Sequence, residues 1–147
     1  MKFLSSIFNT FFFTGMIPFA PGTMGSFFAL LIWFIIQPSF IFMIISLFVV
    51  AVISYFTILF ELKDSTDKDP QHIVIDEAIG MWISLLFISS ANFVYILLSF
   101  VIFRLLDILK PSIIRRLDEY QGPLGILLDD IASGIITCMI LIGFSSL

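Results

Sequence analysis

The distribution of charged residues constrains this chain more than any other feature. No Asp, Glu, Lys or Arg occurs between Phe3 and Phe60, and two further uncharged stretches cover Ala78–Phe103 and Ile131–Leu147. The 147 residues are 60% hydrophobic and 12% charged, whereas a soluble domain is about 45–50% apolar and about 25% charged. One aqueous core cannot hide this many apolar groups. The sequence therefore predicts a protein whose solvent is largely lipid.

Composition also excludes several other classes of protein. Nineteen Phe residues exclude a disordered chain, because disordered segments are poor in aromatic residues. Cys138 is the only cysteine, which excludes a disulfide scaffold. A net charge of −4 without a basic stripe argues against a nucleic-acid partner. The length predicts a single domain over residues 1–147, and the sequence specifies no oligomeric state.

The apolar stretches predict an all-α fold. Spanning helices need roughly 20 mostly apolar residues, and within lipid a helix satisfies its own backbone hydrogen bonds. We expect a polytopic membrane bundle of about five spanning helices. Their expected ranges are Met24–Gln37, Ser39–Phe60, Ile73–Ser90, Phe93–Leu109 and Gly125–Phe144. Residues 1–20 resemble a signal peptide, but no small-x-small cleavage site precedes Pro21, so we expect a retained interfacial segment.

The basic residues predict the topology. With five spans, one side of the membrane receives every Lys and Arg that lies outside the spans, and the opposite turns carry none. The set on that side is Lys2, Lys63, Lys68, Lys110, Arg115 and Arg116. The positive-inside rule places this side in the cytoplasm. Four polar clusters also fall on it, so we expect them to converge: Pro21–Ser26, Asp69–Glu77, Phe103–Pro111 and Gly125–Asp130.

Two adjacent acidic pairs, Asp76–Glu77 and Asp129–Asp130, lie within these clusters. A charge inside a span costs about 2.5–3.5 kcal/mol on insertion scales, so such residues usually face a bundle interior. Carboxylates gathered at one point repel each other without a cation, and Mg²⁺ prefers oxygen ligands of this kind. A proton or cation pathway of a carrier fits the same residues, as does simple solvation at the membrane interface.

Basic residues accompany the acids. Arg104, Asp107 and Lys110 are three residues apart, a spacing that places them along one face of a helix. Arg offers a bidentate fork and Lys a point charge to a phosphate, although a structural salt-bridge ladder explains the spacing equally well. In Pro21–Ser26, Thr23 or Ser26 is a candidate helix cap, and backbone N–H groups there favour an anion. His72 is the sole histidine, and we interpret it as polar surface.

Known covalent phosphatase motifs are absent. No Cys is followed six residues later by Arg, one His cannot supply a phosphohistidine pair, and there is no Gly-rich phosphate loop. Metal-assisted attack by water is the simplest phosphoryl chemistry left.

Four motifs together resemble the phosphatidylglycerophosphatase A family of bacterial inner membranes. They are PGTMGS, DPQHIVIDEAIG, FRLLDILKPSIIRRLD and GPLGILLDDIASG, in this order and spacing. The resemblance implies an all-helical, Mg²⁺-dependent enzyme that removes the terminal phosphate of phosphatidylglycerophosphate, a membrane lipid. It also implies that Asp76, Glu77, Asp107, Asp129 and Asp130 belong to the polar site. The motifs around that site contain Thr23, Ser26, Asp69, Arg104 and Lys110.

Within this resemblance, each side chain receives an expected role. We expect Mg²⁺ to be held by Glu77, Asp129, Asp130 and Asp69. Asp76 and Asp107 are the expected catalytic carboxylates. Thr23, Ser26, Arg104 and Lys110 are expected to bind the substrate phosphate. A phosphatase of another lipid or polyprenyl phosphate is the alternative within enzymes, and a small membrane cation carrier is the alternative outside them.

Overall fold

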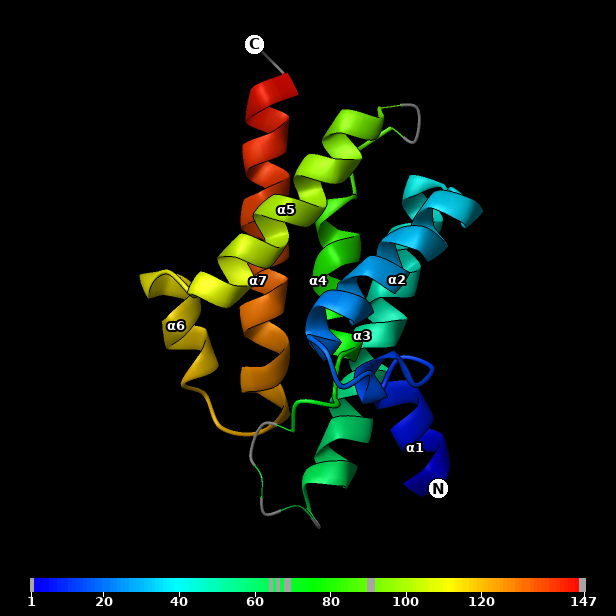
Figure 1. Ribbon diagram of the computed structural model, residues 1–147, viewed down its shortest axis with the longest axis vertical. Helices are drawn as coiled ribbons and strands as arrows, with labels where there is room; N and C mark the ends of the chain where they lie inside the picture. The colour runs from blue at the N-terminus through cyan, green and yellow to red at the C-terminus, as the bar shows by residue number, and fades with distance from the viewer. Residues whose placement is uncertain (1, 64, 66, 68–69, 90–91, 146–147) are drawn as a thin grey trace.

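The computed structural model describes residues 2–63, 65, 67, 70–89 and 92–145. Within these ranges the fold is all-helical, with seven α-helices, one 3₁₀ helix and no strand (Figure 1), which confirms the predicted class. The elements are α1 (Lys2–Asn9), η1 (Thr14–Met16), α2 (Pro21–Ile36), α3 (Phe40–Leu62), α4 (Ile75–Ser84), α5 (Phe93–Leu109), α6 (Ser112–Asp118) and α7 (Pro123–Ser145).

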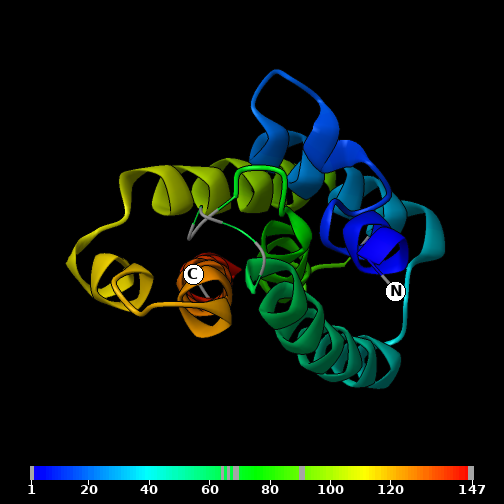
Figure 2. The ribbon, with the colours of Figure 1, turned by 90° about the horizontal axis from the view of Figure 1, so that it is seen from below.

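Helix α4 lies at the centre of the molecule and packs against α2, α3, α5 and α7 (Figures 1 and 2). Its Ala78, Ile79 and Met81 are buried together with polar Asp76 and Ser84. The other helices form a shell around it, with α1 and α6 on opposite sides of the molecule. Most of α4 is therefore surrounded by protein rather than by solvent.

The contact between α4 and α7 depends on two glycines. A methyl group added to Gly134 would overlap the backbone carbonyl of Gly80, and one added to Gly80 would overlap the backbone carbonyl of Asp130. Small residues allow two helix backbones to approach closely, as at the helix interfaces of membrane proteins. The close approach brings the first turns of α7 beside the first turn of α4, where both acidic pairs lie.

Two helices are long and apolar enough to cross a membrane: α3, with 23 residues, and Pro123–Phe144 of α7, with 22. Much of α3 points away from the protein, and Ile41 and Phe48 are each 71% exposed. A large exposed apolar face is unfavourable in water, and it indicates a membrane protein. The expected number of about five spanning helices is not confirmed, because among the described residues these two alone meet the requirement.

The central helix is shorter than the sequence pattern predicted. The expected span was Ile73–Ser90, but α4 covers 10 residues, Ile75–Ser84. That length corresponds to about 15 Å, roughly half of the hydrocarbon core of a bilayer. At its end, the N–H groups of Leu85 and Leu86 donate to carbonyls three residues back, which tightens the chain into turns. Because protein surrounds α4, its apolar pattern reflects burial and not a full crossing.

The first 20 residues fold back on themselves. After α1, three consecutive residues adopt the left-handed conformation, with φ of 44°, 56° and 68° at Phe11, Phe12 and Phe13. This reversal turns Phe11 inward, where its ring meets Trp82 edge-on at a centroid distance of 5.8 Å. Phe12 points outward and is 70% exposed. The exposed aromatic side chain agrees with the expected interfacial segment, which stays a prediction.

Candidate active site

A cleft of about 710 Å³ opens where α2, α4 and α7 begin and α5 ends. The side chains predicted for the site line this cleft, with two exceptions. Those that line it are Thr23, Asp76, Glu77, Arg104, Asp107, Lys110, Asp129 and Asp130. Ser26 lies behind the cleft wall and is fully buried, and Asp69 falls outside the described residues. The expected convergence of four separate polar clusters is therefore confirmed.

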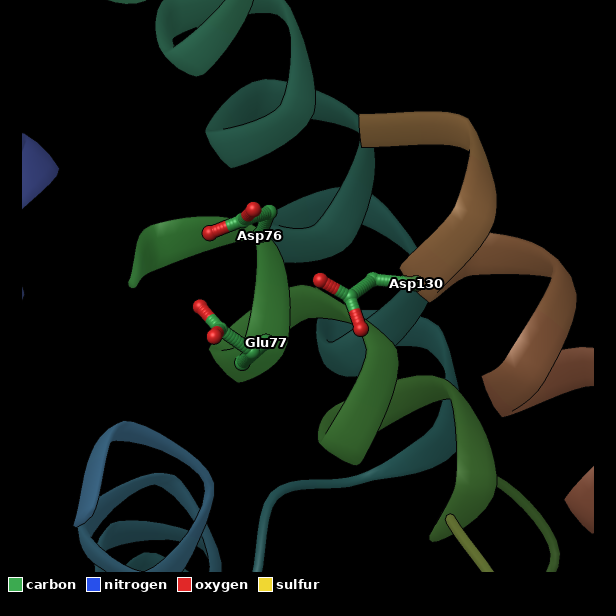
Figure 3. A group of neighbouring side chains, drawn as sticks. All are labelled: Asp76, Glu77 and Asp130. Atoms are coloured by element: carbon green, nitrogen blue, oxygen red, sulfur yellow. The ribbon is translucent and has the colours of Figure 1, made fainter. Parts of the chain in front are cut away.

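Three carboxylates form the acidic centre of the cleft (Figure 3). Asp76 and Glu77 occupy the first turn of α4, and Asp130 faces them from α7. One oxygen from each side chain lies within 4.8 Å of the other two. Asp76 and Asp130 are only 7% and 3% exposed. Buried carboxylates this close together are unfavourable unless positive charge or protons compensate them.

Several oxygens of the cleft meet no hydrogen-bond donor within the described part of the chain. They are Asp76 Oδ1, Glu77 Oε2, Asp129 Oδ1 and Asp130 Oδ1. A buried acceptor without a partner costs about 1–3 kcal/mol, and more when it is charged. Most buried polar atoms in proteins do have a partner, so this cluster of exceptions indicates that the site receives a ligand.

A basic wall faces the acidic centre from α5. Arg104 Nη1 lies 2.6 Å from Asp107 Oδ2 and donates to Ser26 Oγ at 3.4 Å. Ser26 in turn donates to the carbonyl oxygen of Gly22 at 2.8 Å. The guanidinium is therefore held between α2 and α5. Ser26 acts on Arg104 rather than lining the cleft, which favours a positioning role over the predicted contact with substrate.

Lys110 departs from the predicted stripe on α5. The helix ends at Leu109, and Lys110 adopts the left-handed conformation with φ of 42°. Its Nζ consequently reaches Asp118 Oδ1 at 2.5 Å and Asp129 Oδ2 at 2.8 Å. Partial burial would lower the pKa of Lys110, but the two hydrogen-bonded carboxylates outweigh it and raise that pKa above its ordinary value. Lys110 therefore stays charged and fixes one oxygen of Asp129.

The N-terminus of α2 closes the cleft. This helix begins at Pro21, so Thr23 and Ser26 lie inside it, and neither is the cap expected from the sequence. The residue before the helix is Ala20, in the left-handed conformation and without a side-chain cap. The first N–H groups of a helix attract anions. A methyl group on Gly22 would overlap Glu77 Oε1, so α2 touches the acidic centre directly.

A second polar cluster, missed in the sequence, holds the segment before α4. The fully buried Asn9 donates to Glu61 Oε2 at 2.5 Å and accepts from Thr57 Oγ1 at 2.7 Å. The backbone carbonyl oxygen of Asn9 accepts from the N–H of Val74 at 2.9 Å. His72 Nε2 lies 2.7 Å from Glu61 Oε1. His72 is outside the cleft, as its interpretation as polar surface predicts. The members of this cluster are far apart in the chain, so no short spacing in the sequence predicts their contacts.

The fold defines a helical protein of the membrane type. Its cleft combines acidic side chains, an arginine and a helix N-terminus, a combination typical of enzymes that act on phosphate esters. The chain belongs to the phosphatidylglycerophosphatase A family, whose profile matches residues 7–145. This membership confirms the family resemblance and the assignment as an enzyme.

Individual relatives agree with the family. A protein named phosphatidylglycerophosphatase A from Escherichia coli (strain K12) is 39% identical over 131 residues, covering 87% of this chain and 76% of the relative. Its namesake from Haemophilus influenzae is 35% identical over 133 residues, covering 83% and 77%. A putative phosphatidylinositol-3-phosphatase from Bacteroides thetaiotaomicron is 31% identical over 141 residues, covering 91% and 89%. No solved structure matches the chain significantly.

Proposed function

We propose that this protein is a Mg²⁺-dependent phosphatase that converts phosphatidylglycerophosphate into phosphatidylglycerol and inorganic phosphate. One observation carries the proposal: the buried Asp76 and Asp130 and the half-buried Glu77 share a cleft with an arginine and the N-terminus of α2. Family membership and the names of the relatives from E. coli and H. influenzae support this substrate.

The donor set of the acidic centre fits Mg²⁺, which favours carboxylate oxygens and retains water and phosphate ligands. Asp76, Glu77 and Asp130 each offer an oxygen without a donor within the described residues, and we propose that these three hold the ion. Asp76 thus takes the place predicted for Asp129, whose Oδ2 is bound to Lys110. When bound, Mg²⁺ supplies positive charge that offsets the carboxylates and the phosphate oxygens.

The phosphate is bound by groups on the wall of the cleft. Arg104 presents its planar fork to two phosphate oxygens, and Asp107 and Ser26 fix the orientation of that fork. The N–H groups at the start of α2 face the same cleft, where Gly22 and Thr23 lie. Donors held in place before the reaction stabilise the charge that develops on the transferring phosphoryl group.

Asp129 is the carboxylate best placed to move a proton. Lys110 fixes its Oδ2, while its Oδ1 meets no donor within the described residues. In the proposed step, water forms a bond to phosphorus while the bond from phosphorus to the glycerol oxygen breaks. Asp129 accepts a proton from the water and passes it to the glycerol oxygen. Water and phosphomonoester thus become phosphate and alcohol without a covalent enzyme intermediate.

We also propose a location in the bacterial inner membrane, with several crossings and with the cleft on the cytoplasmic side. The basic residues that follow α5 are Lys110, Arg115 and Arg116, and Lys110 lines the cleft. The positive-inside rule assigns such a segment to the cytoplasm. In this arrangement α2 and α5 are embedded beside the two long apolar helices, and α4 is enclosed among them.

Phosphate release from lipid vesicles tests the proposed function. Purified protein is reconstituted in phosphatidylcholine vesicles that contain phosphatidylglycerophosphate, and phosphate and phosphatidylglycerol are measured with Mg²⁺ or with EDTA. We expect both products with Mg²⁺ alone. The Glu77→Gln variant should lose turnover, whereas Glu119→Gln, which removes the same charge from an exposed residue of the cleft rim, should retain it. Release that persists in EDTA, or no release at all, would contradict the proposal.

Phosphatidylinositol 3-phosphate is a second candidate substrate. The relative from B. thetaiotaomicron that is named for this activity aligns with 91% of the chain, more than either of the other two relatives. The same vesicles with phosphatidylinositol 3-phosphate give a direct comparison of kcat/KM. A higher value for this lipid than for phosphatidylglycerophosphate would transfer the assignment to it.

A further inference from the structure

The rim of the cleft combines polar and apolar side chains. The polar ones are Asp118, Glu119 and Gln121, at the loop that joins α6 to α7. Helix α5 contributes Ile108, which is 66% exposed although it lines the cleft. Phe19, 79% exposed, lies between the lining residues Pro18 and Ala20. A site for a wholly water-soluble substrate has no need of a half-apolar rim.

Ile108 also begins an apolar stripe along α5. Leu97, Val101, Leu105 and Ile108 are spaced by four, four and three residues, so they share one face of the helix. All four are exposed, at 53%, 44%, 52% and 66%. The stripe is about 16 Å long at 1.5 Å per residue. Arg104 lies on α5 beside this stripe, one turn before Ile108, so the phosphate-binding group and the apolar surface are continuous.

We propose that the stripe on α5, together with Phe19 beside the cleft, is the seat of the acyl chains of the lipid substrate. This inference rests on the proposed function and extends it to how the lipid is held. Its phosphate lies against Arg104 and the acidic centre, and its chains leave over Ile108 along α5 toward the bilayer. Substrate therefore enters sideways from the membrane, and product phosphate leaves past the polar loop.

The exposed apolar face of α3 differs from the stripe on α5 because it does not adjoin the cleft. Ile41 and Phe48 on α3 are as exposed as Ile108 and Phe19, but no α3 residue lines the cleft. Lipid that contacts α3 is therefore not in contact with the cleft. This contrast supplies matched controls, with the same residue types at similar exposure and no access to the site.

The test compares two substrates on the same enzyme preparations. One is dioleoyl phosphatidylglycerophosphate in phosphatidylcholine vesicles, and the other is its water-soluble deacylated headgroup. For Ile108→Ser and Phe19→Ser we expect the ratio of kcat/KM, acylated over deacylated, to fall roughly tenfold, since each change removes one apolar contact with a chain. Ile41→Ser and Phe48→Ser should leave the ratio unchanged. Loss of folded protein cancels in this ratio.

A conservative variant sharpens the result. Ile108→Leu keeps an apolar side chain of the same size, so it should keep the wild-type ratio. Equal ratios in Ile108→Ser, Ile41→Ser and the wild type would overturn the acyl-chain seat while leaving the phosphatase assignment intact. A wild-type protein that hydrolyses neither substrate would instead refute the proposed function, and the seat with it.

Discussion

Neutralising Asp130 should stabilise the protein and abolish its activity. Its carboxylate oxygen lies within 4.8 Å of oxygens of Asp76 and Glu77. Two unit charges at that distance repel by about 3.5 kcal/mol at an effective dielectric constant of about 20. Proton uptake and nearby positive charge relieve most of this energy, and we expect roughly 1 kcal/mol to remain. In EDTA, Asp130→Asn should therefore raise the apparent Tm by about 2–4 °C for a chain of this size, and it should abolish turnover.

The assay is thermal unfolding in detergent, followed by intrinsic tryptophan fluorescence, with EDTA or with saturating MgCl₂. Mg²⁺ should raise the Tm of the wild type, because a ligand that binds only the folded state stabilises it. The same addition should leave Asp130→Asn unchanged. Glu119→Gln is the control, since it removes one charge from an exposed position and should match the wild type in both conditions. A lower Tm for Asp130→Asn in EDTA, or a retained Mg²⁺ response, would refute the reasoning.

Four further substitutions probe the cleft and the polar cluster around Asn9. Arg104→Lys should lower kcat/KM roughly tenfold to a hundredfold, because a point charge replaces the bidentate guanidinium. Ser26→Ala should have a smaller effect. Equal effects of these two substitutions in phosphate-release assays would favour a purely structural role for the ion pair of Arg104. Gly22→Ala should lower kcat at least roughly tenfold, since its methyl group would stand 2.1 Å from Glu77 Oε1 and displace that carboxylate by about 1 Å. A wild-type kcat would show that α2 moves aside instead. Asn9→Ala should lower the Tm by several degrees, corresponding to a loss of about 1–3 kcal/mol in the free energy of unfolding for the polar partners left unpaired. An unchanged Tm in thermal unfolding would contradict the role of Asn9 in holding the segment before α4.

The sequence predicted the convergence of the polar clusters better than it predicted the lengths of the helices. Four short polar clusters in an otherwise apolar chain are expected at helix ends, and the structure confirms that they converge. Local periodicity does not show what covers a helix. The apolar run after Asp76 therefore predicted a full span, whereas α4 ends at Ser84 inside a shell of other helices.

The grouping within the cleft also depended on tertiary structure. Adjacent residues on a helix point about 100° apart, so the sequence could not show which member of each acidic pair faces the other pair. The left-handed turn at Lys110 decides this for Asp129, because it brings Nζ to Asp129 Oδ2. The network around Asn9 was equally hidden, since its partners lie 48 and 52 residues away in the chain.

Metal binding by the acidic centre tests the central claim most directly. Mn²⁺ serves as a paramagnetic substitute for Mg²⁺, and electron paramagnetic resonance counts the ions bound by purified protein. The wild type and Glu119→Gln should bind at least one ion. Both Glu77→Gln, on α4, and Asp130→Asn, on α7, should lose it. Undiminished binding in these two variants would contradict a site shared between the two helices.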